Sequence, residues 1–299
     1  MAIVVGEPVC IVPAGDRCGE APVWCAEEQA LYWTDINRFL IHRLDLAGGC
    51  VRSWFFAEPV TALALTHSAG TLAVALGSRI ILWSPRSDER REHGFRLAGW
   101  PGVRLNDGRP DPRGSFWVGS MRNNVAADGA PGECGGTDGV LYRVDPGGAV
   151  SQWKRGIGIS NTLVWSPDRT RFYFADTLQN AIFVYDYDCT TGAIRNERPF
   201  FTNFERGLPD GSAMDSEGYI WNCRHGGASI VRIAPGGGID RVIEMPTRNV
   251  TSCTFGGVNH GTLFATSASL DAPPGDRLAG GLFAFQISVP GLPENRFRV

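Results

Sequence analysis

Residues 161–185 read NTLVWSPDRTRFYFADTLQNAIFVY, and this stretch decides the fold class. An apolar run at its start leads into the turn Ser166-Pro167-Asp168-Arg169, and a second run follows at 171–176. Proline at the second position of such a turn presets φ, which favours a tight reversal of the chain. A third run at 181–185 is β-branched and aromatic, as strands are. The stretch therefore predicts three antiparallel strands.

The same order recurs five more times along the chain. Counterparts of the second run lie at 30–35, 71–75, 115–119, 219–222 and 262–266, and counterparts of the third at 39–44, 79–83, 140–144, 229–233 and 281–285. Units of about 40–60 residues with three or four short strands are typical of β-propellers. We therefore predict an all-β fold, a six-bladed β-propeller with four-stranded blades, formed by residues 1–299 as one domain. An ordinary β-sandwich or two small β domains would not repeat one motif order six times.

Composition narrows the classes of partner. The net charge is −3 and no block of like charges occurs, so we expect neither a nucleic-acid nor a membrane partner. The N-terminal residues 1–7 lack a basic segment followed by a long apolar one, and the eight cysteines form no C-x-x-C pair. These features favour a cytoplasmic protein with isolated thiols. A monomer or weak oligomer is the default expectation for a closed propeller.

Polar residues stand at the start of the first strand of four units. Asn106, Asn161 and Asp210 each precede the residue that opens the hairpin turn by the same step of five, and Glu20 stands at the equivalent place in the first unit. The first strand of each blade lines the central channel of a propeller, so equivalent residues form a ring. The two remaining units offer Thr61 or Ala62, and Ser252. A polar residue at a strand start is often only a turn former, and this alternative stays open for each position taken alone.

Four oxygen-bearing side chains in a narrow channel repel one another unless a positive charge lies between them. An all-oxygen ligand set suits Ca²⁺, Mg²⁺ or Mn²⁺, and does not suit a structural zinc site built from Cys and His. We predict one divalent metal ion, with Ca²⁺, Zn²⁺, Mn²⁺, Mg²⁺ and Fe²⁺ all left open as its identity.

Four motifs in order resemble those of the SMP-30/gluconolactonase/regucalcin family. They are Gly19-Glu20-Ala21-Pro22-Val23-Trp24, Arg104-Leu105-Asn106-Asp107-Gly108, Ile159-Ser160-Asn161-Thr162 and Leu208-Pro209-Asp210-Gly211. Late glycine pairs at 256–257 and 280–281 also match. Each motif alone is weak, but together they span nearly the whole chain.

The resemblance implies a catalytic metal centre. It implies that Glu20, Asn161 and Asp210 are the metal ligands, and that Asp210 is also the general base. Asn106 would lie close to the metal and contact substrate or a bound water, and Arg104 would reach substrate hydroxyl or carboxyl groups. Known members of the family hydrolyse aldonolactones, so the resemblance implies a small-molecule sugar lactone as substrate.

One stretch departs from the family pattern. Many relatives carry an acidic residue after the segment Gly119-Ser120-Met121, where it meets sugar hydroxyls, but this chain has Arg122 and Asn123. We assign both to substrate binding, and their presence leaves the identity of the sugar open. The Gly/Ala-rich stretch 126–136 is the best candidate for a mobile loop that covers the channel as a lid.

Two other functions fit the same scaffold. A phosphotriesterase-like hydrolase would need a hydrophobic pocket, whereas Arg104, Arg122 and Asn123 favour a polyhydroxylated substrate. A non-enzymatic Ca²⁺-binding regulator would not need a ligand ring with an open coordination position. No G-x-S-x-G or H-E-x-x-H motif is present, so a covalent nucleophile is not expected.

Overall fold

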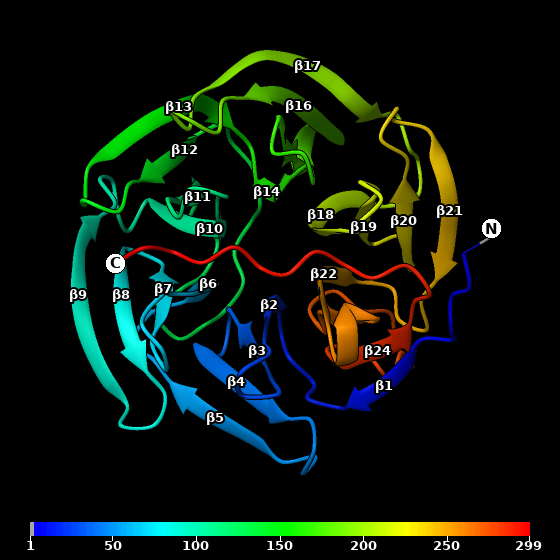
Figure 1. Ribbon diagram of the computed structural model, residues 1–299. Helices are drawn as coiled ribbons and strands as arrows, with labels where there is room; N and C mark the ends of the chain where they lie inside the picture. The colour runs from blue at the N-terminus through cyan, green and yellow to red at the C-terminus, as the bar shows by residue number, and fades with distance from the viewer. Residues whose placement is uncertain (1–2) are drawn as a thin grey trace.

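A computed structural model describes residues 3–299 as six four-stranded antiparallel sheets arranged in a ring (Figure 1). The predicted six-bladed β-propeller is confirmed. Among the described residues, regular helix is limited to two single 3₁₀ turns, η1 (Thr177–Gln179) and η2 (Val258–His260). Within the described residues, no helix has the length and apolar character needed to cross a bilayer.

The blades follow one another in chain order. Blade 1 contains β2 (Gly19–Cys25), β3 (Ala30–Asp35), β4 (Leu40–Asp45) and β5 (Val51–Phe55); blade 2 contains β6 (Val60–Leu65), β7 (Leu72–Leu76), β8 (Arg79–Ser84) and β9 (Glu89–Arg96); blade 3 contains β10 (Val103–Pro110), β11 (Phe116–Arg122), β12 (Gly139–Val144) and β13 (Val150–Ile157). Blade 4 contains β14 (Ser160–Trp165), β15 (Arg171–Asp176), β16 (Ala181–Tyr187) and β17 (Ile194–Thr202); blade 5 contains β18 (Leu208–Met214), β19 (Ile220–His225), β20 (Ser229–Ile233) and β21 (Ile239–Glu244); blade 6 contains β22 (Val250–Gly256), β23 (Thr262–Ser267), β24 (Leu282–Gln286) and β1 (Val9–Val12).

Burial decreases from the hub to the rim of each blade. Every residue of the inner strand β6 is buried, whereas most of the outer strand β9 is exposed and charged. The repeated apolar runs of the sequence are the second and third strands, because these pack between neighbouring blades on both faces. The outer strands β9 and β17 carry mostly exposed polar or charged residues and therefore lack an apolar signature.

The ring closes through both ends of the chain. Strand β1 pairs with β24 in antiparallel fashion, with Val9 opposite Ala284. The N-terminal strand thus supplies the outer edge of the last blade (Figure 1). The chain runs from β1 in blade 6 directly into β2 in blade 1, so the hydrogen bonds between β1 and β24 within blade 6 close the ring.

The tight turn after the inner strand is fixed by one aspartate in several blades. In blade 5, Asp215 Oδ1 accepts the backbone N–H groups of Glu217 and Tyr219, both at 3.0 Å, and its Oδ2 accepts the indole N–H of Trp221 at 3.0 Å. Asp111 and Trp117 repeat the arrangement in blade 3. A buried aspartate thereby satisfies both the turn and a core tryptophan, which explains the recurrence of these residues.

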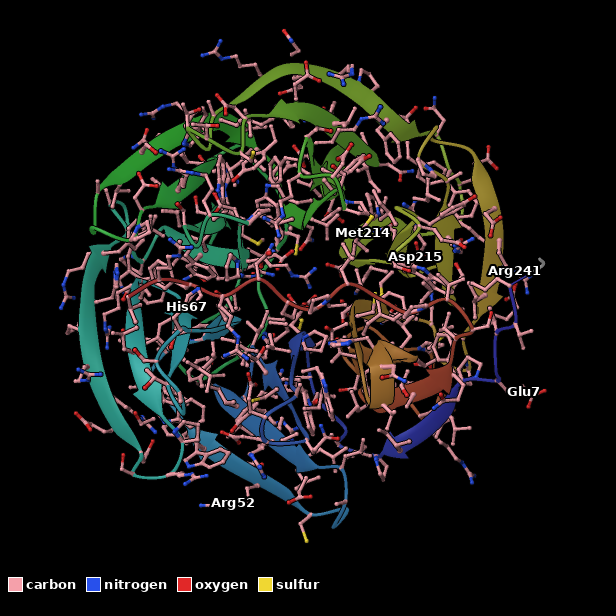
Figure 2. All side chains as sticks on the ribbon, viewed as in Figure 1. Glu7, Arg52, His67, Met214, Asp215 and Arg241 are labelled. Carbon is pink, nitrogen blue, oxygen red and sulfur yellow. The ribbon has the colours of Figure 1, made fainter. Side chains whose placement is uncertain are left out.

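The C-terminal segment 288–299 crosses the face of the ring where the inner strands end (Figure 1). Leu292 N–H donates to Met214 O at 3.0 Å, and Phe297 N–H donates to Leu65 O at 2.8 Å. Figure 2 shows Met214 and Asp215 toward the centre of the ring, whereas Glu7, Arg52 and Arg241 lie at its rim. The segment covers one end of the channel, and the starts of the inner strands lie at the other end, which we call the mouth.

Candidate active site

Inner strands carry an irregularity near the mouth. Pairing with the second strand shifts by one residue between Glu20 and Val23, between Asn161 and Val164, and at the corresponding places of the other blades. A β-bulge of this kind re-aims side chains and is common beside active sites. Ala21 and Thr162, which directly follow Glu20 and Asn161, have φ values of 47° and 54°. A positive φ costs energy for residues other than glycine. The strained backbone directly follows the side chains that the bulge turns toward the channel.

The bulges bring two carboxyl groups together. Glu20 and Asp210 come from blades 1 and 5, each is only 7% exposed, and the two carboxyl groups lie close enough to affect each other's pKa. Burial, together with the nearby charge of Asp107, raises the pKa of Glu20 to about 8. Burial also raises the pKa of Asp210 well above its ordinary value, reinforced by repulsion from Glu20. Without a cation, the pair therefore holds a proton at neutral pH.

Asn161 is linked to the segment that carries Asp210, because Thr177 contacts both Asn161 Nδ2 and Pro209 O. Asn161 is buried, and its Nδ2 donates to Thr177 Oγ1 at 2.9 Å, which leaves Oδ1 on the other side of the amide. Asn106 Nδ2 lies 3.3 Å from that Oδ1 and donates to Ser160 O at 2.9 Å. Asn106 is therefore in direct contact with Asn161, one of the predicted metal ligands.

These donors fit a hard divalent cation. Two carboxylates and an amide oxygen are oxygen ligands of the type that Ca²⁺, Mg²⁺ and Mn²⁺ bind. Within residues 3–299, neither Glu20 nor Asp210 forms a salt bridge, and the charge of Arg104 acts on Glu20 only from a distance. No cluster of three or more His, Cys, Asp or Glu side chains suited to a metal occurs in this part of the chain. The candidate site depends instead on the amide of Asn161.

Arg104 is buried beside Asn106 and is largely occupied by protein acceptors. Its Nη1 donates to Asn106 Oδ1 at 2.6 Å and to Leu105 O at 2.9 Å, and its Nε and Nη2 both donate to Asn124 Oδ1, at 3.0 and 2.8 Å. A guanidinium group has five N–H bonds, so one of them remains for a further partner. Asn124 is thus a site residue that the sequence argument missed, although it directly follows the stretch 122–123 that was singled out.

The structure places the other two predicted substrate residues in separate contacts. Arg122 is half-exposed, and its Nε donates to Asp138 Oδ2 at 2.8 Å. Asn123 Nδ2 donates to Pro101 O at 3.0 Å, and its Oδ1 accepts the N–H of Val125 at 3.0 Å. No contact among the described residues joins either side chain to Arg104 or to the carboxyl pair. Their role in substrate binding stays a prediction.

The segment between β11 and β12 reaches from blade 3 to blade 1. Asn37 Nδ2 donates to Gly129 O at 2.9 Å, and Val125 packs with Ile36 and Phe39 in a small apolar cluster. Gly129 has φ 80°, and a side chain there would meet Asn37 O at 2.0 Å, so only glycine fits this contact. The stretch predicted as a lid is therefore fastened to another blade, and through Asn124 it also contacts the site.

A buried arginine lies behind Asp210. Arg224 Nη2 donates to Gly207 O at 2.6 Å and to Asn180 Oδ1 at 2.7 Å, and its Nη1 donates to Asn222 Oδ1 at 3.2 Å. Burial lowers the pKa of Arg224 to about 10, opposed by the charge of Asp210. Two further acceptors are the backbone oxygens of Phe204 and Arg206, and all five are neutral. Arg224 therefore provides positive potential near Asp210 while it orders the loop that leads into β18.

The far end of the channel is closed by charged residues as well as by backbone. Glu294, from the C-terminal segment, accepts a hydrogen bond from Thr254 Oγ1 at 2.8 Å and lies 3.5 Å from Arg109 Nε. Arg109 Nη1 donates to Ser212 O at 2.7 Å. Substrate access to the carboxyl pair is therefore expected from the mouth.

Comparison with known proteins gives consistent matches over the whole chain. The profile of the SMP-30/Gluconolactonase/LRE-like region matches residues 18–269. A 6-deoxy-6-sulfogluconolactonase of Pseudomonas putida is 35% identical over 298 residues, which cover 96% of this chain and 97% of that protein. Pentonolactonase XacC of Haloferax volcanii is 32% identical over 295 residues and 96% of both chains. The crystal structure of a calcium-binding protein, regucalcin, from Agrobacterium tumefaciens superposes with a TM-score of 0.90 at 28% identity, covering 98% of both chains.

Proposed function

The chain belongs to the SMP-30/gluconolactonase/LRE-like family, and from this premise we propose that it is a metal-dependent lactonase that opens a sugar lactone to the aldonic acid. Two relatives that align over nearly their full lengths are named as lactonases of sugar acids. Their names specify different sugars, so the substrate class proposed here is the aldonolactones as a group.

One observation supports the proposal above the others. Two carboxyl groups from different blades, Glu20 and Asp210, are buried close enough for the charge of Glu20 to raise the pKa of Asp210, and Thr177 links Asn161 to the residue before Asp210. Burying two carboxylates without a cation is costly, and a fold would not retain this arrangement for packing alone. The similarity to a calcium-binding regucalcin agrees with a divalent metal at this place.

Glu20, Asn161 and Asp210 would hold the metal. When bound, a divalent cation polarises the lactone carbonyl and offsets the negative charge that develops on its oxygen. Asp210 would accept a proton from the attacking water and return it to the ring oxygen as the ester bond breaks. The water oxygen becomes part of the new carboxyl group, and the ring oxygen becomes a hydroxyl, so no covalent enzyme intermediate is required.

Neighbouring residues would orient the substrate. Asn106 lies between Arg104 and Asn161, and Arg104 retains one N–H that no protein group uses. A hydroxyl of the sugar acid can accept this hydrogen bond. Arg122 and Asn123, placed by the same segment that carries Asn124, would contact substrate farther from the reacting carbonyl.

The test is acid release from a panel of five- and six-membered aldonolactones, measured against a no-enzyme blank. The metal-loaded protein should hydrolyse at least one of them, and both chelator treatment and Asp210→Asn should remove the activity. Asp186→Asn, a change to an exposed residue of β16, serves as the matched control and should retain it. Thermal unfolding would verify that each variant is folded. Metal binding without acid release from any lactone would favour a calcium-binding regulator instead.

A further inference from the structure

The peptide carbonyl before each candidate metal ligand is held by a side chain of the preceding blade. Before Glu20, Gly19 O accepts the hydroxyl of Thr251 from blade 6. Before Asn161, Ser160 O accepts Asn106 Nδ2 from blade 3 at 2.9 Å. Before Asp210, Pro209 O accepts Thr177 Oγ1 from blade 4 at 2.8 Å. Each ligand is therefore tied to a neighbouring blade at its own backbone.

Thr177 differs from the other two because it joins the strands of two candidate ligands, Asn161 and Asp210. Asn106 also contacts a ligand side chain, Asn161 Oδ1 at 3.3 Å, but both contacts of its Nδ2 lie in β14. The single hydroxyl proton of Thr177 is directed to Pro209 O, so its oxygen can only accept from Asn161 Nδ2, at 2.9 Å. A flipped Asn161 amide would place two acceptors against each other. The hydroxyl therefore fixes which end of the amide faces the channel, and it links the strand of Asn161 to the strand of Asp210.

Thr177 is itself held firmly. It is the first residue of η1, and the preceding Asp176 caps this turn by accepting the N–H of Leu178 at 3.2 Å. Asp176 Oδ2 also accepts the N–H of Gly158 at 3.0 Å, which leads into β14. Thr177 and Asn161 are both buried, so water does not compete for the contact.

From this arrangement we propose that Thr177 is a positioning residue that sets the metal affinity of the site. It presents the oxygen of Asn161 to the metal and fixes the peptide that carries Asp210. The inference rests on the proposed function, since it assumes that these residues bind a metal. Residues that orient metal ligands through hydrogen bonds typically change affinity by roughly 10- to 100-fold when removed.

The experiment measures Mn²⁺ binding to the chelator-stripped full-length protein by isothermal titration calorimetry. Thr177→Val keeps the shape of the side chain and removes the hydroxyl, and should weaken binding by roughly 10- to 100-fold. Thr177→Ser restores the hydroxyl and should bind nearly as tightly as the unmodified protein. Thr66→Val is the matched control, because Thr66 is also buried and its Oγ1 donates to Thr71 O at 2.8 Å, beyond the end of β6 that lies away from the mouth. It should leave Mn²⁺ affinity unchanged.

The outcomes separate the two proposals. Equal Mn²⁺ affinity in Thr177→Val and the unmodified protein would overturn the positioning role and leave the lactonase proposal standing. Weak binding in Thr177→Ser as well would also overturn it, because the methyl group and not the hydroxyl would then be responsible. Absence of Mn²⁺, Ca²⁺ and Mg²⁺ binding by the unmodified protein would overturn both proposals. If Thr177→Val does not fold, as thermal unfolding without metal would reveal, the comparison of Thr177→Ser with Thr177→Ala decides the question.

Discussion

Replacing Glu20 by glutamine should change how the metal-free protein responds to pH. Burial raises the pKa of Glu20 in the folded state to about 8 from an ordinary value of 4.5. Between these values the folded state binds a proton that the unfolded state has lost, so stability falls as pH rises. The contribution of this group is fully present below pH 4.5 and is lost as the pH passes through 8. Glutamine has the same shape and does not titrate.

The size of the effect follows from the shift. Each pH unit between the two pKa values is equivalent to about 1.4 kcal/mol, so the unmodified protein should lose roughly 3 to 4 kcal/mol between pH 5 and pH 8 from this group. For a chain of 299 residues this corresponds to roughly 5 °C in the unfolding temperature. Glu20→Gln should lack this part of the decline.

Calorimetric unfolding with excess chelator at pH 5, 6, 7 and 8 would measure the difference. Glu7→Gln is the matched control, because it makes the same chemical change at an exposed residue on the rim (Figure 2). It should follow the unmodified protein at every pH. If stability fell with pH in the same way for Glu20→Gln and for the unmodified protein, the inferred rise in the pKa of Glu20 would be refuted.

Three further results are expected. Mn²⁺ affinity should rise by up to about tenfold per pH unit from pH 6 toward pH 8, because metal binding displaces the proton held by the carboxyl groups of Glu20 and Asp210. Calorimetry in two buffers of different ionisation enthalpy should detect the released proton. A Mn²⁺ affinity that does not change with pH would contradict this prediction. Asn124→Ala removes the acceptor of two Arg104 N–H groups and should raise KM for the lactone several-fold while the protein still folds. An unchanged KM in steady-state assays would show that the position of Arg104 does not affect substrate binding. Phe297 of the C-terminal segment is fully buried, so Phe297→Ala leaves a cavity and should lower the free energy of unfolding by about 3 to 5 kcal/mol, measured by denaturant unfolding. A loss below about 1 kcal/mol would show that packing of this side chain is not needed for stability.

The fold could be predicted because its second and third strands carry a repeated signal. Runs such as Arg171–Asp176 and Ala181–Tyr187 pack between blades and must be apolar, so they stand out in the sequence. The outer strand Glu89–Arg96 faces solvent, and its charged residues give no such signal. The pairing of β1 with β24 was also invisible, because it depends on how the ring closes and not on any local pattern.

The candidate site was predictable for side chains that sit at an equivalent step of the repeat. Glu20, Asn161 and Asp210 were found because the unit fixes their position relative to the turn. Asn124 and Thr177 lie in connections whose length and course differ between blades, so no alignment of the units could place them. Their contacts, to Arg104 and to Asn161, depend on the three-dimensional path of those connections.

Closure through β1 and β24 has a consequence for synthesis on the ribosome. Strand β1, which completes blade 6, is translated before the other strands, and its partner β24 (Leu282–Gln286) emerges after all of them. During translation the early blades can form hairpins, but β1 waits without a partner and the apolar flank of blade 1 stays uncovered. We expect nascent chains that lack β24 to recruit chaperones or aggregate, and the ring to close only after β24 has emerged and paired with β1.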